Sequence, residues 1–168
     1  MGEMMQRINR GKAEAVFHTG FTGGLHGRGA PADPHRKVTI KPFEEEGVSS
    51  HYCVEDWHAI LLGLAVDETN DGVTSVGEAK KLFAPTVMTF VLDGAPFETT
   101  RLAVRPFLDD FPGRGFILVQ GRVVAPGEPA VGSHTLTVTV ENDPVVPDEV
   151  QVFTREFFID AAGTGSCV

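Results

Sequence analysis

The sequence predicts a mainly β protein in which antiparallel strands form a sandwich. The clearest sign is the stretch 135–140, where Thr and aliphatic residues alternate as they do in a strand with one buried and one solvated face. Similar stretches occur at 86–92, 116–124 and 150–160, and turns rich in Pro, Gly and Asp separate them. Several short strands divided by such turns are typical of two packed sheets.

The first half of the chain predicts one strand and then two helices. Residues 37–41 alternate as a short strand does, and Pro42 ends it. A first helix is predicted by apolar residues at helical spacing, namely Val54, Trp57, Ile60, Leu61 and Leu64. The second helix starts at a capping box formed by Ser75 and Glu78, and it ends before Pro85. We therefore expect a helical insertion at about residues 53–84.

The second half predicts only strands. Asp93-Gly94 follows the strand 86–92, and this dipeptide is typical of a tight hairpin turn that leads to a partner strand at about 97–104. The strand 116–124 and the Thr-rich strand come next. In the final strand, 150–160, the apolar phase shifts between Val152 and Phe153, which predicts a bulge.

Residues 86–168, about half of the chain, resemble the immunoglobulin-like β-sandwich modules of bacterial surface and secreted proteins. The matching features are Val-Leu-Asp-Gly-Ala-Pro at 91–96, the turn 125–127 before the strand 132–138, and the closing Phe158-Ile159-Asp160. The Cys-Trp-Cys core of antibody domains is not part of the resemblance. The resemblance implies a fold and leaves the activity open, because one fold carries many functions.

We expect a Gly-rich arm at residues 1–37 and a single domain at 38–168. Residues 1–41 hold seven Lys or Arg and three Asp or Glu, a balance of +4, whereas residues 42–168 have a balance of −13. Such an acidic domain repels a phosphate backbone, so nucleic acid is not an expected partner.

No apolar stretch approaches the roughly 20 residues that a membrane-spanning helix needs, so no membrane span is expected. The first seven residues lack the apolar centre of a secretory signal. The chain is therefore either cytoplasmic or a mature form. We favour an extracellular or periplasmic location on the assumption that a signal peptide has been removed.

The two cysteines, Cys53 and Cys167, admit two interpretations. A disulfide between them would close a loop of about 113 residues and stabilise the fold by roughly 4–5 kcal/mol in the chain-entropy model. The alternative is two unrelated thiols, one in a helix and one in the C-terminal tail.

Residues 67–78 have the spacing of an EF-hand calcium loop, with Gly72 at the sharp turn and a predicted helix on either side. The six ligand positions would be Asp67, Thr69, Asp71, Val73, Ser75 and Glu78. Thr69 and Thr74 depart from the usual pattern, and only three carboxylates would face the ion, so binding would be weak. The alternative is a polar turn between helices, in which Ser75 and Glu78 only cap the second helix.

Other motifs do not define a catalytic centre. His51, Cys53 and His58 fit no established zinc spacing, and no nucleophile elbow follows a strand. The sequence therefore predicts a non-catalytic binding or structural module, with calcium as its candidate cofactor and a protein or cell-surface ligand as its partner. One alternative is a small enzyme or ligand-binding protein with a cleft near His51, Trp57 and His58. Another is a self-assembling subunit, a homo-oligomer whose arm docks on a neighbour.

Overall fold

The computed structural model describes residues 36–107 and 114–167, so nearly all of the predicted N-terminal arm lies outside the described residues. The strands are β1 (Lys37–Ile40), β2 (His51–Cys53), β3 (Trp57–Asp67), β4 (Val87–Leu92), β5 (Ala95–Pro96), β6 (Thr100–Arg101), β7 (Arg105–Phe107), β8 (Gly115–Val124), β9 (Gly132–Glu141) and β10 (Gln151–Asp160). The helices are α4 (Glu68–Asp71), α5 (Val76–Phe83) and the short 3-10 helix η2 (Gly165–Cys167).

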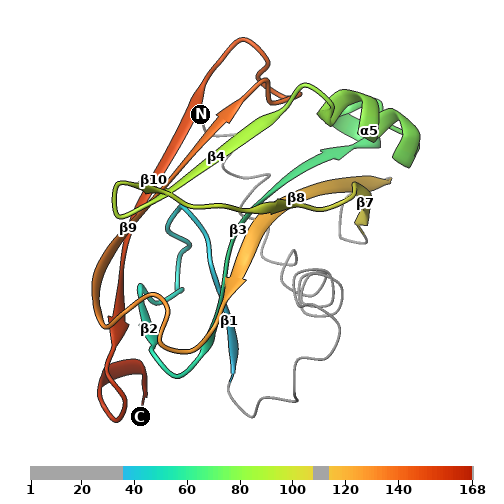
Figure 1. The fold of residues 1–168 in the computed structure, drawn as a ribbon. Helices are drawn as coiled ribbons and strands as arrows, with labels where there is room; N and C mark the ends of the chain where they lie inside the picture. Colours follow the sequence, from blue (N-terminus) through green and yellow to red (C-terminus); the bar gives the residue numbers. More distant parts are fainter. Residues whose placement is uncertain (1–35, 108–113, 168) are drawn as a thin grey trace.

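The strands form two sheets, as the sequence predicts. Sheet A has the order β1-β3-β8-β6, with β7 also paired to β8, and sheet B has the order β2-β10-β9-β4-β5 (Figure 1). The prediction that all strands are antiparallel is wrong, because β1 runs parallel to β3 and β2 runs parallel to β10. In both cases a short strand from the first half of the chain is added to the edge of a sheet.

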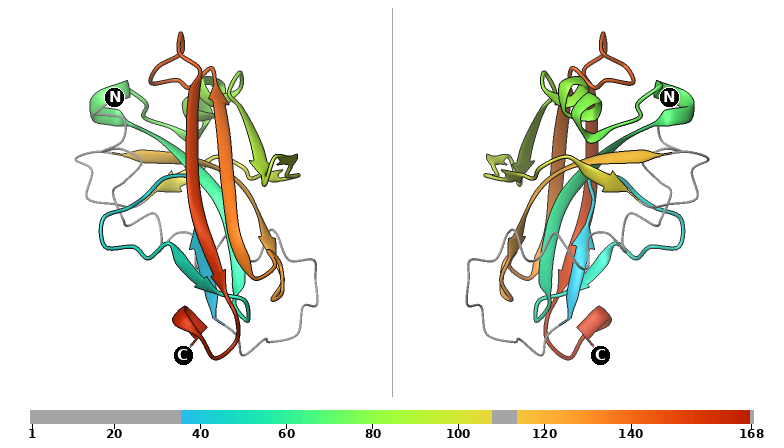
Figure 2. Two further views of the ribbon diagram at one scale, coloured as in Figure 1. Left: turned by 90° about the vertical axis from the view of Figure 1, so that its left-hand side faces the viewer. Right: turned by 90° about the vertical axis from the view of Figure 1, so that its right-hand side faces the viewer.

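The two sheets enclose one hydrophobic core, and Figure 2 shows them as two layers. The inward side chains of sheet A include Ile60, Leu62 and Leu118, and those of sheet B include Val138 and Phe157. All five are fully buried at 0% exposure. The alternation of the Thr-rich strand is confirmed, since Leu136, Val138 and Val140 are its core residues.

The first predicted helix is wrong, because residues 57–67 form β3, the long strand at the centre of sheet A. β3 is buried on both faces, so apolar residues occupy nearly every position. Such a continuous apolar stretch contains residues at the spacing of a helix as well as at the spacing of a strand. Gly121 on β8 lies opposite Leu61. A Cβ at Gly121 would collide with the Leu61 Cβ and with the carbonyl oxygen of Ile60, so the close approach of these two strands requires glycine there.

The second predicted helix is confirmed as α5, which Ser75 caps by accepting a hydrogen bond from the Glu78 backbone N–H at 3.2 Å. The hairpin turn is also confirmed, with φ of 53° at Asp93 and 78° at Gly94. The partner strand predicted at about 97–104 is wrong. The last bond to β4 comes from the Phe97 N–H, which donates to the Phe90 carbonyl at 2.9 Å, and the chain then crosses to sheet A, where β6 and β7 pair with β8.

The bulge predicted in the final strand is also wrong. The β10–β9 register runs without interruption from Gln151 opposite Val140 to Ile159 opposite Gly132. The apolar pattern of this strand is irregular because an arginine, Arg155, occupies an inward position, where it is 3% exposed and donates to the carbonyls of Lys41 and Ser49. Val152 therefore faces solvent, and Phe153 faces the core side.

Candidate functional site

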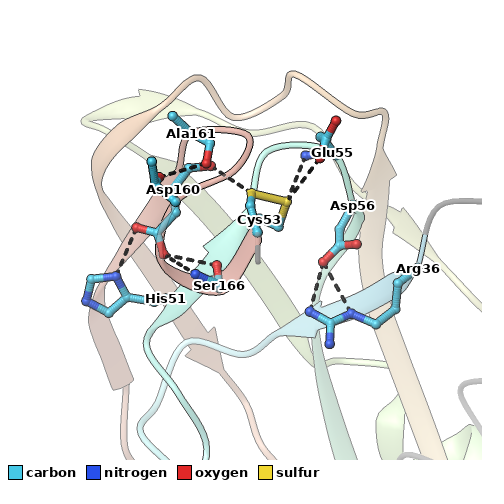
Figure 3. The surroundings of a disulfide bond; sticks show 10 residues. Arg36, His51, Cys53, Glu55, Asp56, Asp160, Ala161 and Ser166 are labelled. Carbon is cyan, nitrogen blue, oxygen red and sulfur yellow. Dashed lines mark hydrogen bonds and ion pairs between the residues drawn. A yellow bond between two sulfur atoms is a disulfide. The ribbon is translucent and has the colours of Figure 1, made fainter.

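Three of the residues that the sequence singles out, His51, Cys53 and Cys167, lie where β2 joins β10 and the C-terminal tail folds back (Figure 3). The parallel pairing sets His51 opposite Phe158 and Cys53 opposite Asp160. Because side chains alternate along a strand, His51 and Cys53 share one side of β2 and Tyr52 points to the core on the other.

Cys53 and Cys167 form a disulfide in this structure. Their Cα atoms are 4.7 Å apart, and the bond joins β2 to η2 near the C-terminus. Cys53 is 5% exposed, and the backbone N–H of Glu55 lies 3.4 Å from its sulfur. Of the two interpretations of the cysteines, the structure adopts the bridged one, and neither sulfur is a free thiol.

Asp160 organises the tail that carries Cys167. Its Oδ2 accepts hydrogen bonds from the backbone N–H and the hydroxyl of Ser166 at 2.8 and 3.0 Å. Its Oδ1 lies 3.1 Å from the Nδ1 of His51. The Ser166 N–H and the His51 ring together hold the pKa of Asp160 below its ordinary value. His51 also stacks on the ring of Phe158, with 4.8 Å between centroids.

Asp56 and His58 are occupied by structural contacts. The Asp56 carboxylate accepts from the Arg36 guanidinium at 3.0 Å, which ties β1 to the turn before β3. His58 is 0% exposed, and its Nδ1 lies 3.1 Å from the Glu128 carbonyl oxygen. Burial lowers the pKa of His58, and the Glu128 carbonyl offsets part of this effect, so the ring is neutral near pH 7 and donates that hydrogen bond.

The structure does not bring the predicted cleft residues into one group. His51 is exposed on the outer side of β2, whereas His58 lies in the core against the ring of Tyr52, which β2 directs inward. Trp57 is half-buried at the start of β3. His51 and His58 therefore lie on opposite sides of β2.

The predicted calcium segment lies between β3 and α5. The helix expected before the loop is wrong, since Asp67 is the last residue of β3 and the N-cap of α4. The Asp67 carboxylate accepts from Asn70, and that of Asp71 accepts from the Asp67 N–H at 2.8 Å. Glu78 accepts from the N–H and hydroxyl of Thr74, and these contacts hold the pKa of Glu78 below its ordinary value.

The six predicted ligand positions differ in exposure. Thr69, Ser75 and Glu78 are exposed, while Asp67 and Val73 are buried at 2% exposure. Among the described residues, the one group of three His, Cys, Asp or Glu donor atoms that lie together is Cys53, Glu55 and Cys167. Two of those donors are the disulfide sulfurs, so the group is a disulfide with a neighbouring carboxylate. Calcium binding at 67–78 stays a prediction.

The sequence reasoning missed three polar residues that hold this end of the fold: Asp160, Arg155 and His134. His134 Nδ1 lies 2.7 Å from the Asp93 carboxylate and its Nε2 lies 2.6 Å from the Ala130 carbonyl. In the sequence, the one signal for such a role was a polar residue at a position that the strand alternation directs inward, namely 134 on β9 and 155 on β10. Arg101 is a further polar residue with a structural role, since it caps the C-terminal end of α5 by donating to the carbonyls of Phe83 and Thr86.

Comparisons of this chain with protein-family models, with curated proteins and with solved structures find no match. In the two described ranges, every helix is too short or too polar to cross a membrane. The function is therefore inferred from the geometry of this chain alone.

Proposed function

We propose that this chain is a non-catalytic binding module with an immunoglobulin-like sandwich fold, and that it binds a protein or cell-surface ligand through the outer face of sheet B. The observation that carries the proposal is the pair of adjacent uncharged rows across that face. In the first row, Thr139 lies between Thr89 and Val152. In the second row, Thr137 lies between Val91 and Thr154. On the same face Glu141 lies beyond the first row and Glu156 beyond the second, so the uncharged area lies between two acidic positions.

The rows form an ordered surface. Thr137 and Thr154 share a hydrogen bond between their hydroxyls at 3.2 Å, and Val152 is 62% exposed. Hydroxyls and methyl groups held on paired strands offer a partner hydrogen bonds and apolar contact without the cost of desolvating charge.

An exposed aromatic pair lies on the same face, near the end of β10 where β2 pairs with it. Phe158 is 39% exposed and the ring of His51 stacks on it. The His51–Asp160 contact fixes the imidazole, so the pair is ordered before a ligand arrives. Such preorganised rings contribute affinity because little side-chain entropy is lost on binding.

The nearby groups that could serve catalysis are used to hold the fold. The Cys53 sulfur is in a disulfide, Asp56 pairs with Arg36, and His58 is buried on Glu128. A disulfide persists in an oxidising compartment, which supports action outside the cytoplasm.

The test is binding of the labelled full-length chain to panels of extracellular proteins and polysaccharides and to intact bacterial cells. Thr137→Lys and Phe158→Ser should each weaken retention by about tenfold, which is about 1.4 kcal/mol. Lys80→Glu on the exposed surface of α5 is the matched control and should bind as the unmodified chain does. Melting temperatures should agree across the set.

Two results would overturn the proposal. Equal retention by both face variants would show that this face does not bind. Turnover of a substrate that disappears in His51→Ala would instead support the alternative of a small enzyme. Light scattering of the same samples tests the self-assembly alternative, which requires a mass that is a multiple of one chain.

A further inference from the structure

Two acidic side chains bound the uncharged area on the outer face of sheet B. Glu141, the last residue of β9, is exposed and lies one row beyond Thr139. Glu156 on β10 is exposed and lies opposite Thr135. Strand alternation directs both side chains outward. Glu141 and Thr135 are six residues apart on β9, so the two acidic positions are about 20 Å apart along the strands, at about 3.3 Å a residue.

The face has little positive charge to offset these carboxylates. Neither Glu141 nor Glu156 has a basic partner among the described residues. Arg155 is the single Lys or Arg on the strands of sheet B in the described ranges, and it points to the core, where it is 3% exposed and donates to backbone carbonyls. His51, at the end of the face, is in contact with the Asp160 carboxylate.

The connection from β9 to β10 adds negative charge at one end of the face. Asp148 and Glu149 are exposed and lie in this connection, which starts directly after Glu141. No Lys or Arg occurs in residues 142–150. Carboxylates of one sign on a surface raise the local concentration of groups of the opposite sign and repel groups of the same sign. The face therefore attracts cations.

The centre of the face differs from its ends because it offers apolar contact. Val152 is 62% exposed and lies beside Thr139. Val87, which lies opposite Glu141, is 48% exposed. An uncharged centre with charged groups at its edge is the usual arrangement of a protein–protein interface.

We propose that the partner of this face is a basic protein, whose surface carries Lys or Arg side chains about 20 Å apart on either side of an uncharged patch. This inference rests on the proposed function and adds the chemical class of the partner. A second copy of the chain is disfavoured, because its own Glu141 and Glu156 would approach acidic positions and like charges cost affinity. Anionic polysaccharides are repelled for the same reason.

The test measures binding of the full-length chain to immobilised probes: purified basic extracellular proteins with an isoelectric point above about 9, purified acidic ones, and a polylysine peptide. The Glu141→Lys/Glu156→Lys variant reverses the charge at both positions on the face. Glu44→Lys/Glu98→Lys, at exposed positions outside sheet B, is the matched control. Each Glu→Lys change adds +2, so both variants change the net charge from −9 to −5.

We expect the unmodified chain to bind the basic probes in preference to the acidic ones. The face variant should lose roughly tenfold or more of this binding, mainly through slower association, and the control should lose much less. Salt raised from about 0.01 M to about 0.15 M should weaken binding of the unmodified chain, because it screens the attraction. Melting temperatures show whether each variant folds. If the face variant unfolds, Glu141→Gln/Glu156→Gln carries the test, with Glu44→Gln/Glu98→Gln as its control.

Several results would overturn the inference. Equal loss in the face variant and the control would show that only net charge matters. Equal binding of acidic probes, or binding that salt does not change, would exclude a basic partner. A mass by light scattering that rises with concentration, and that the face variant alters, would assign the face to a second copy.

The variants also separate this inference from the proposed function. Loss of binding in Thr137→Lys and Phe158→Ser, with none in Glu141→Lys/Glu156→Lys, would mean that the face binds a partner that is not basic. The proposed function would then stand and this inference would fail. Unchanged binding in all three would contradict the proposed function itself.

Discussion

Asp160 Oδ2 accepts two hydrogen bonds from Ser166, one from its backbone N–H and one from its hydroxyl. These bonds turn the chain after β10 back toward β2, where Cys167 meets Cys53. Positive φ values at Gly163 and Gly165 make the turn possible, and a Cβ at Gly165 would collide with the Asp160 carboxylate. The carboxylate therefore places one partner of the disulfide beside the other.

Asp160→Ala should make the disulfide easier to reduce. Without the two Ser166 hydrogen bonds, η2 opens more often and a thiol reagent reaches the sulfurs sooner. The rate of reduction by dithiothreitol, followed by trapping of free thiols, should rise several-fold. Glu156→Ala, an exposed substitution on the same strand, is the matched control and should reduce at the unmodified rate. Equal rates in both variants would mean that Asp160 does not hold the tail.

Removal of the disulfide should lower the free energy of unfolding by about 4–5 kcal/mol. The two cysteines are 114 residues apart, and in the chain-entropy model a bond across such a loop restricts the unfolded chain strongly. Urea unfolding of the Cys53→Ser/Cys167→Ser variant measures the difference. Reductant should lower the midpoint of the unmodified chain and leave that of the variant unchanged. A midpoint that reductant does not move in either protein would argue against this role.

Local patterns in the sequence predicted local structure well. The Thr-rich strand, the Asp93-Gly94 turn and the Ser75 cap of α5 each depend on neighbouring residues, and each is present. The sequence predicted a helix where β3 lies. Sheet A is buried on both faces, so apolar residues fill β3 and its local pattern does not distinguish a strand from a helix. That information lies in the rest of the chain.

The candidate site was predictable in part for the same reason. Cys53 and Cys167 could be proposed as partners, since only two cysteines are present. Asp160 could not be identified, because its role depends on a return of the chain that brings Ser166 and His51 to one carboxylate. The parallel pairing of β2 with β10 joins residues more than one hundred positions apart, and no local pattern predicts it.

The melting temperature in calcium separates the two interpretations of residues 67–78, of which the capped turn predicts no change. The carboxylates of Asp67, Asp71 and Glu78 accept hydrogen bonds from nearby N–H groups, which favours a capping role over ion binding. Melting in excess calcium and in EDTA measures the effect. A rise of several degrees that Glu78→Gln abolishes would instead establish 67–78 as a calcium loop. Without calcium, Glu78→Gln should lower the melting temperature slightly, since the Thr74 hydrogen bonds weaken.

Acidification should destabilise the fold through His58. Burial sets the pKa of His58 in the folded state below the ordinary value of 6.5, so the unfolded chain binds the proton more tightly. Stability from this residue is therefore complete above about pH 6.5 and falls as the pH drops toward the lowered pKa. Melting temperature against pH measures this loss. His58→Gln should flatten the curve of melting temperature against pH over this range. His51→Gln, which changes an exposed histidine, is the control and should leave the slope due to His58 in place.

Gly121→Ala should destabilise the protein by about 1–3 kcal/mol or more, because a Cβ there has no space between β8 and β3. The neighbours in its path are the Leu61 side chain and backbone atoms of residues 60 and 61, which cannot move without disrupting the centre of sheet A. Gly77→Ala is the matched control. The nearest atom to a Cβ at Gly77 is the Ser75 hydroxyl oxygen at 3.9 Å, and alanine favours a helix, so α5 should gain about 0.5 kcal/mol. Urea unfolding of the two variants should therefore shift in opposite directions. A Gly121→Ala variant as stable as the unmodified chain would contradict the close packing of β8 on β3.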